Sequence, residues 1–424
     1  MKVAIVHEWL ESFAGSERVV EQLLACWPQA DVFVVCDFLP EAQRGFLGGR
    51  QPRTTFIQRL PFARKRFRWY LGLMPLAIEQ LDLAGYELVL SSSHAVAKGV
   101  LTGPGQLHVS YVHSPMRYAW DLQHEYLRQS GLERGAKGAL TRWMLHRLRA
   151  WDHASAARVD VLVANSTYIA ERIRKAWGRA AVVIHPPVDV SGFPLCQHKE
   201  DYFLVASRMV PYKRVDLIAQ AFRHQPHRRL VVVGDGPCEA QVRAAAGGAP
   251  NIELRGHVGQ AELVALMQGA CACLHAAEED FGIALVEAQS CGTPLIAYGR
   301  GGARDIVRTQ PAADPTGVLF AQQTVESVLD ALTRFDAGRG AITPQACRRN
   351  AMRFTREHFC DAMRALVARG LEGELAPPLD ASSMENSHGP QHFRAHQSAN
   401  LRRGTPAAAV PGGHHRPAGH RGEH

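Results

Sequence analysis

Residues 271–288 have the sequence CACLHAAEEDFGIALVEA, in which an apolar run leads through an acidic loop into a second apolar segment. The run 271–275 has the length of a buried strand, and the apolar pattern of 283–291 predicts a helix. A strand that passes through a loop into a helix is the repeating unit of parallel sheets covered by helices. This stretch therefore predicts an α/β fold for the chain around it.

The same unit recurs on both sides of this stretch. In the first half of the chain we expect strands at 2–6, 32–35, 88–90, 109–112 and 159–164. In the second half we expect them at 202–206, 230–233, 252–254, 271–275 and 294–297. The chain is therefore predicted to form two Rossmann-like, doubly wound domains in tandem, which bind ligands in a central cleft at the carboxyl ends of the strands.

The predicted boundary between these domains is a strand candidate at 181–184 that runs into Pro186 and Pro187. The two domains are expected to cover 1–187 and 188–376, and the last helix, at 354–371, can pack back on the first domain. Residues 377–424 are rich in Pro, Gly, Ala and His and have almost no periodic apolar pattern. We therefore predict a disordered tail there.

Composition narrows the class of protein. The 424 residues include 46% hydrophobic residues, and 48 Lys and Arg against 40 Asp and Glu leave a net charge of +8. No apolar segment approaches the ~18 to 20 residues of a membrane-spanning helix, and the first residues lack a secretory leader pattern, so a cytoplasmic location is expected. The nine cysteines show neither CxxC nor a Cys/His metal pattern. They are predicted to be reduced thiols that bind no zinc.

The excess positive charge is concentrated in one segment. Residues 42–78 carry eight cations and no acid, and the densest part, 64–71, interleaves cations with aromatic residues. This pattern suits the headgroup boundary of an anionic membrane, so peripheral binding to the inner face of the membrane is one prediction. A solvated helix face with inward-packed aromatics is the alternative. No nucleic-acid partner is expected, because no nucleic-acid-binding motif accompanies the patch.

Two loops carry the candidate chemistry. Arg208 and Lys213 follow the strand 202–206 and precede a helix, where a planar fork, a point charge and free N–H groups suit a diphosphate. Glu279 precedes the helix 283–291 and Glu287 lies within it. A carboxylate in an apolar run needs a partner, and sugar or ribose hydroxyls would serve. The alternatives are ordinary surface cations, an acid favoured by the helix dipole and an exposed Glu.

Taken together, these motifs resemble retaining family-4 glycosyltransferases of the GT-B fold. Glu279 and Glu287 match the E-x7-E signature of that family, and further motifs follow in the family's order over about residues 1–371. These are Gly15-Ser16-Glu17, Tyr111-Val112-His113-Ser114-Pro115, Asn165-Ser166, Pro186-Pro187-Val188-Asp189, Gly234-Asp235-Gly236-Pro237 and Gly301-Gly302. Ala14 stands where relatives often carry glycine, so close backbone approach to a diphosphate there depends on Gly15 alone.

The resemblance implies a role for each matching residue. Glu279 and His113 are the implied catalytic residues, beside the transferred hexose. The implied donor-binding residues are Gly15, Arg208 and Lys213 at the diphosphate, Glu287 at the ribose, Val258 near the base, and the backbone of Phe281 and Gly282 beside the hexose. The N-terminal domain would then face the acceptor, and the C-terminal domain would bind the nucleotide sugar. No metal or cofactor is implied, because cationic side chains and helix ends stabilise the leaving diphosphate.

The implied reaction is retaining transfer of a hexose from a nucleotide sugar to a saccharide or lipid-linked saccharide in surface-polysaccharide assembly. Front-side attack through an oxocarbenium-like ion pair is expected, and mannose from GDP-mannose is the favoured donor. Two alternatives remain: a non-catalytic nucleotide-sugar-binding scaffold and a sugar-nucleotide epimerase of the same fold. A nicotinamide dehydrogenase is disfavoured because Glu239 replaces the third glycine of G-x-G-x-x-G. His94 is either an acceptor-side residue or a structural histidine.

Overall fold

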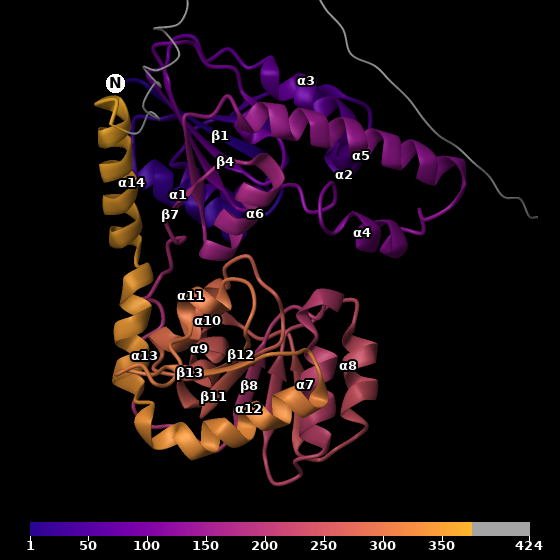
Figure 1. Cartoon of the computed structure of the whole chain (residues 1–424), viewed down its shortest axis with the longest axis vertical. Coiled ribbons are helices and arrows are strands. Elements are labelled where there is room, and N and C mark those ends of the chain that lie inside the picture. The colour runs from indigo at the N-terminus through magenta and orange to yellow at the C-terminus, as the bar shows by residue number, and fades with distance from the viewer. Residues whose placement is uncertain (375–424) are drawn as a thin grey trace, which may run out of the picture. The chain divides into compact units, whose positions relative to one another are not determined.

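Two parallel sheets, each flanked by helices, form the two lobes of the molecule (Figure 1). The structure is a computed structural model that describes residues 1–374. The N-terminal sheet has the order β3-β2-β1-β4-β5-β6-β7. Its strands are β1 (Val3–Leu10), β2 (Asp31–Asp37), β3 (Arg53–Thr54), β4 (Leu88–Ser93), β5 (Leu107–Val112), β6 (Val161–Ala164) and β7 (Val182–Val183). Its helices are α1 (Gly15–Cys26), α2 (Ala63–Arg66), α3 (Met74–Glu79), α4 (Gln123–Gln129), α5 (Gly135–Ala156) and α6 (Thr167–Trp177).

The C-terminal sheet has the order β10-β9-β8-β11-β12-β13, and all its strand pairs are parallel. Its strands are β8 (Phe203–Ala206), β9 (Leu230–Val233), β10 (Ile252–Gly256), β11 (Ala272–His275), β12 (Leu295–Tyr298) and β13 (Gly317–Phe320). The helices that follow are α7 (Val215–Arg223), α8 (Glu239–Ala246), α9 (Gln260–Gly269), α10 (Ile283–Ser290), α11 (Ala303–Ile306), α12 (Val325–Gly338), α13 (Pro344–Ala351) and α14 (Arg356–Leu371).

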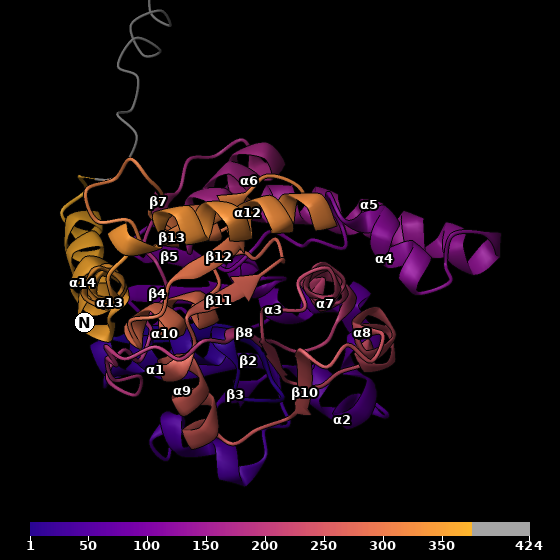
Figure 2. The ribbon, with the colours of Figure 1, turned by 90° about the horizontal axis from the view of Figure 1, so that it is seen from below.

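Alternation along the strands places apolar side chains on both faces of the C-terminal sheet. Leu230 and Val232 of β9 pack with α7, α8 and α12, whereas Val231 and Val233 pack with α9, α10 and α11. Figure 2 shows α7, α8 and α12 on one side of the sheet and α9 and α10 on the other. A strand buried on both faces needs apolar residues at every position, which is why the short uninterrupted runs in the sequence predict it. The predicted α/β architecture is confirmed.

The last helix, α14, packs against the N-terminal lobe although it follows the C-terminal sheet in the chain (Figure 1). Phe359, Met363 and Leu366 of α14 join one buried cluster with side chains of α1 and of the strands β1 and β4. The chain therefore crosses between the lobes twice, once after β7 and once before α14. None of the helices in residues 1–374 is long and apolar enough to cross a membrane.

The packing of α14 on α1 also corrects one expectation about the cysteines. Cys26 at the end of α1 and Cys360 in α14 are joined by a disulfide, with their Cα atoms 5.8 Å apart. The prediction that all cysteines are reduced is therefore wrong for this pair. The two residues are 334 positions apart, so only tertiary packing brings them together. The predicted tail, 377–424, lies outside the described residues.

Candidate active site

A cleft of about 910 Å³ lies between the lobes and is lined by both of them. Its walls come from the loops that follow β1, β4, β5 and β6 in the N-terminal lobe and β8 and β11 in the C-terminal lobe. In the sheet orders, β1 lies beside β4 and β8 lies beside β11, and at both places the strand order reverses. Ligands of open α/β sheets bind outside such switch points, because the loops there diverge and leave a crevice.

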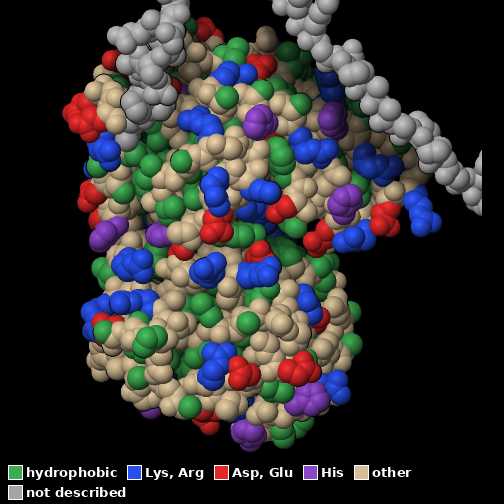
Figure 3. Space-filling view, in the orientation of Figure 1, with side chains coloured by type: hydrophobic (Ala, Val, Ile, Leu, Met, Phe, Trp, Pro, Cys, Tyr) green, Lys and Arg blue, Asp and Glu red, His purple; other side chains and the backbone are tan. Residues whose placement is uncertain are grey.

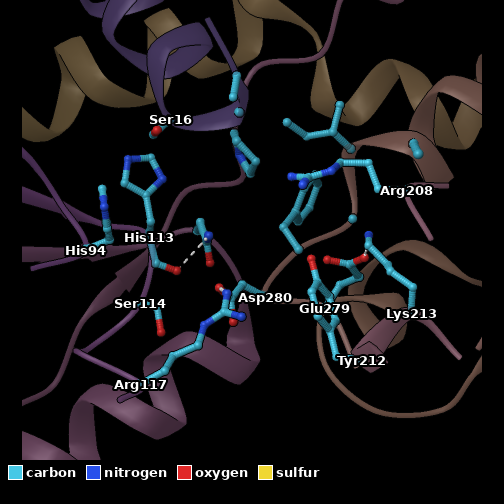
Figure 4. Close-up of a pocket in the computed structure, with 18 of the residues that line it drawn as sticks. Ser16, His94, His113, Ser114, Arg117, Arg208, Tyr212, Lys213, Glu279 and Asp280 are labelled. Carbon is cyan, nitrogen blue, oxygen red and sulfur yellow. Dashed lines mark hydrogen bonds and ion pairs between the residues drawn. The ribbon is translucent and has the colours of Figure 1, made fainter. Parts of the chain in front are cut away.

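A charged group forms the C-terminal wall of the cleft. Lys213, after β8, forms an ion pair with Glu279, and the ring of His275, the last residue of β11, lies 3.1 Å from the same Glu279 oxygen. Burial alone would raise the pKa of Glu279, but the hydrogen bond from His275 and the charge of Lys213 lower it to about 2. Glu279 is therefore a carboxylate at neutral pH, with donors on either side. Arg208 also lines this wall (Figure 4).

The loop that carries Arg208 is supported by the glycine-rich segment after β9. Met209 donates its N–H to the carbonyl of Asp235 at 2.6 Å. Gly234 has a φ of +117°, and a Cβ on it would lie 2.0 Å from the Ser207 carbonyl oxygen. Only glycine allows both this backbone conformation and this approach. The Gly234-Asp235-Gly236-Pro237 motif thus holds the Arg208 loop in place rather than lining the cleft itself.

The helix α10 continues this wall. It begins after Gly282, whose φ of +104° again favours glycine, and both Phe281 and Gly282 line the cleft. The Phe281 side chain is buried and stacks on His185, with ring centroids 5.4 Å apart. Glu287 faces the cleft from α10 and accepts a hydrogen bond of 2.9 Å from Arg18 of α1. The two carboxylates of E-x7-E therefore lie on one wall, with the helix start between them.

Gly15 and His113 line the opposite, N-terminal wall. Gly15 begins α1, and a Cβ there would make only an ordinary contact of 3.6 Å with Ile283, so the space beside it is open to a ligand. The Nε2 atom of His113 lies 2.8 Å from Ser92 Oγ. Burial lowers the pKa of His113 well below its usual value, and His94 lowers it further, so the ring is neutral at pH 7.

His94 lies beside His113 and also lines the cleft, with ring centroids 6.3 Å apart (Figure 4). Its loop is held by the fully buried carboxylate of Glu8, which accepts N–H bonds from Ala95 at 2.7 Å and Val96 at 2.8 Å. Burial lowers the pKa of His94, and the charge of Glu8 opposes this shift without cancelling it. The geometry is compatible with an acceptor-side role, and the alternative of a structural histidine stays open.

An ion pair also crosses the cleft between the lobes. Arg117, after β5, pairs with Asp280, and Arg172 of α6 lies 3.6 Å from the same carboxylate. Figure 4 shows Arg117 and Asp280 pointing toward one another between the two walls. The Ser166 hydroxyl donates a hydrogen bond to the carbonyl oxygen of Asp280. These contacts bring the Glu279–Gly282 loop against the N-terminal lobe.

The structure brings together most of the residues that the sequence singled out. Gly15, His113, Arg208, Lys213, Glu279, Phe281, Gly282 and Glu287 all line the cleft. Val258 does not: it packs, half-buried, against the core beneath α9, α10 and α11. Sequence reasoning missed His275, Arg18, Arg117 and Asp280. Of these, only His275 had a local signal, since it ends a predicted strand four residues before Glu279.

Cationic side chains border the groove between the lobes (Figure 3). Arg18 and Arg117 of the N-terminal lobe and Arg208 and Lys213 of the C-terminal lobe all line the cleft. Arg18, Arg117 and Lys213 are each paired with a carboxylate of the same cleft, and Arg208 is exposed at its wall. The cations suit a phosphorylated ligand, and the carboxylates beside them suit hydroxyl groups. Within residues 1–374, no three His, Cys, Asp or Glu side chains are grouped so that they could hold a metal ion.

Comparison with protein families identifies both lobes. Residues 13–191 match Glycosyltransferase Family 4, and residues 193–354 match Glycosyl transferases group 1. The chain is built from two GT-B glycosyltransferase domains. The boundary between the two matched segments falls between residues 191 and 193, shortly after Pro186 and Pro187.

Curated relatives match just under half of this chain. The D-inositol 3-phosphate glycosyltransferase of Mycobacterium marinum is 28% identical in an alignment of 217 residues, which covers 45% of this chain and 45% of that protein. The Mycobacterium avium counterpart is 29% identical in an alignment of 216 residues, which covers 45% of this chain and 49% of that protein. The match thus spans just under half the length of each relative.

The fold of the glycosyltransferase domains is shared with solved structures at low identity. A sucrose-phosphate synthase from Thermosynechococcus elongatus superposes with a TM-score of 0.64 at 15% identity, covering 88% of this chain and 100% of that one. The Anabaena protein HepE in complex with UDP gives 0.60 at 15%, covering 87% and 100%. A lipopolysaccharide outer core galactosyltransferase gives 0.60 at 16%, with the same coverage.

Proposed function

We propose that the protein is a retaining glycosyltransferase that moves a hexose from a nucleotide sugar to a saccharide or lipid-linked saccharide. The observation that carries the proposal is the group formed by Lys213, Glu279 and His275, which faces His113 across a cleft between two glycosyltransferase domains. Cations for a diphosphate and carboxylates for hydroxyl groups therefore line the same cavity.

The donor fits the C-terminal wall in the order of its chemical groups. Arg208 and Lys213 bind the diphosphate, and the start of α1 at Gly15 adds free N–H groups from the other lobe. Glu287 accepts hydrogen bonds from the ribose hydroxyl groups. These replace the hydrogen bond that Arg18 donates to Glu287 in this structure. Glu279 accepts a hydrogen bond from a hydroxyl group of the hexose, because its low pKa keeps it an ionised carboxylate that can only accept.

The reaction follows from this placement. The bond between the anomeric carbon and the diphosphate oxygen breaks, and the negative charge that develops on the diphosphate is stabilised by Arg208 and Lys213. The acceptor hydroxyl attacks from the same face, its oxygen forms the new bond to the anomeric carbon, and its proton passes to the diphosphate. The cations supply the charge stabilisation that a divalent ion would otherwise give, so the proposal needs no metal.

The identity of the substrates is the finer part of the proposal. GDP-mannose is the donor we favour, with an acceptor in surface-polysaccharide assembly at the inner face of the membrane. The names of the relatives point to D-inositol 3-phosphate as a second acceptor candidate, and the HepE complexes point to UDP-glucose as a second donor candidate. A panel of these donors and acceptors, followed by mass spectrometry, would identify the transferred sugar.

Two glutamate variants separate an enzyme from a non-catalytic scaffold. We expect Glu279→Ala to lower transfer by at least about 10²-fold, as when a preorganised polar group is lost from an active site, while nucleotide binding stays nearly intact. Glu287→Ala should weaken nucleotide binding itself, because its carboxylate would contact the ribose. Calorimetric titration with GDP and UDP, beside the transfer assay, measures both effects.

A glutamate remote from the cleft provides the control. Glu326 is exposed in the first turn of α12, so Glu326→Ala should leave both binding and transfer unchanged. Tight nucleotide-sugar binding by the wild type, with no transfer or hydrolysis across the donor and acceptor panel, would favour the scaffold and contradict the proposal.

A further inference from the structure

Two cation-rich segments that are far apart in the sequence meet on the N-terminal lobe. The first is the segment of α2 and the following 3-10 helix, Phe67–Leu73, which belongs to the acid-free stretch 42–78. The second is α5, whose residues 135–151 carry Lys137, Arg142, Arg147 and Arg149 and no acid. A Cβ at Gly72 would lie 3.4 Å from Met144 Sδ, so the two segments are in contact.

Large apolar side chains on both segments are exposed. Trp69 is 70% exposed, and Leu140 and Trp143 of α5 are 65% and 61% exposed. Leu140, Trp143 and Arg147 are spaced three and four residues apart, so they lie along one face of the helix. A cluster of exposed Trp and Leu beside cations is unusual for a surface that meets only water.

A groove of about 530 Å³ separates the two segments and is lined mainly by apolar side chains. Trp69 and Leu73 line it from one side, and Leu140, Trp143 and Met144 line it from the other. Arg147 also lines it, and the Arg66 guanidinium lies 4.2 Å from the centre of the Trp69 ring. The groove is therefore apolar within and cationic at its edge.

The structure also shows which cations of the stretch 42–78 are exposed and which are paired with an acid. Arg44 is paired with Asp37, and Arg68 is paired with Glu11 at 2.5 Å. Phe67 is buried in the core, although the sequence counted it among the aromatics of the patch. Arg64, Lys65 and Arg66 are exposed, so the cationic surface is smaller than the stretch itself but is enlarged by α5.

We propose that this surface, formed by residues 64–73 and 137–147, docks on anionic phospholipid bilayers and that its groove takes an acyl chain. Trp69 and Trp143 would lie at the boundary between headgroups and acyl chains, where amphipathic rings are favoured. Arg64, Lys65, Arg66, Lys137 and Arg147 would face the anionic headgroups. Charge complementarity singles out this partner, because residues 64–73 and 137–147 combine cations with apolar side chains and include no acid.

Binding to vesicles of phosphatidylglycerol and phosphatidylcholine tests the charge. Each basic residue near an anionic surface strengthens binding to the membrane. Changing Arg64, Lys65 and Arg66 to Gln should therefore lower the partition coefficient about 10²-fold. Lys137→Gln with Arg147→Gln should lower it about tenfold or more, which tests α5 separately. The matched control changes three exposed cations elsewhere on the lobe, Arg128, Arg174 and Lys175, to Gln and should bind as the wild type does.

Tryptophan fluorescence tests the groove. Vesicles with brominated acyl chains should quench the wild type more than the variant in which Trp69 and Trp143 are both changed to Ser. Thermal melting and transfer to a water-soluble acceptor show that each variant is folded, and they separate this proposal from the proposed activity. Equal vesicle binding by wild type and variants, binding that ignores lipid charge or 1 M salt, or quenching unchanged in the tryptophan variant would overturn the proposal.

Discussion

Lys213 and Arg208 approach the cleft from one loop, yet their surroundings differ. Lys213 is ion-paired with Glu279, whereas Arg208 is exposed at the wall. We expect Lys213→Ala and Arg208→Ala each to lower donor turnover by at least about 10²-fold, because each removes a positioned charge from the leaving diphosphate. Lys213→Ala should also free Glu279 from its partner. Initial rates with a saturating acceptor, with and without EDTA, measure the effect.

EDTA should leave the wild-type rate unchanged, because the side chains supply the positive charge. Wild-type affinity for nucleoside diphosphate in both variants, or a strict requirement for a divalent ion, would contradict this account of the donor site.

At the scale of elements, the loop between β12 and α11 supports the loop that carries Glu279. Gly302 donates its N–H to the Glu279 carbonyl at 2.8 Å, and a Cβ on Gly302 would lie 2.3 Å from Phe281 Cα. Gly302→Ala must therefore displace residues 279–281. A shift of about 1 Å can cost about 10²-fold in rate, so transfer should fall by that order. Nucleotide binding should fall less, since Arg208 and Glu287 lie on other elements. Initial rates and nucleotide titration measure the two effects.

The control for this substitution is Gly340→Ala, because a Cβ at Gly340 meets nothing within 4 Å. Transfer by Gly302→Ala at the wild-type rate would show that the Glu279 loop does not depend on this support.

At the scale of the whole molecule, α14 belongs to the N-terminal lobe although the chain reaches it last. Phe359, Met363 and Leu366 bury apolar area against α1 and the N-terminal sheet, at about 25 cal/mol for each Å² removed from water. A chain that ends at Phe354 should therefore lose stability in its N-terminal lobe, with early thermal unfolding. A chain that ends at Glu374 keeps every described residue and is the reference. Equal melting temperatures for the two chains would contradict this role.

Much of the fold was predictable because it depends on neighbouring residues. A strand buried on both faces needs a continuous apolar run, and such runs at 203–206 and 230–233 appear as strands. The strand candidate at 181–184 contains β7, whereas β3, the helix α5 and the strand β13 were not expected. β3 is only two residues long, and α5 has little periodic apolar signal. The spacing of Glu279 and Glu287 likewise follows from the chain alone, because a short loop and about one helical turn separate them.

Tertiary structure decided the contacts between distant residues. Arg18 meets Glu287 across 269 positions, Arg117 meets Asp280, and Cys26 meets Cys360. Each of these pairs forms only because the two lobes and α14 pack together, and no local pattern records which charge will face which. The same reason applies to the groove between the 3-10 helix and α5. The sequence by itself therefore determined the elements and the kinds of chemistry at their ends, while packing decided which of these groups share one cavity.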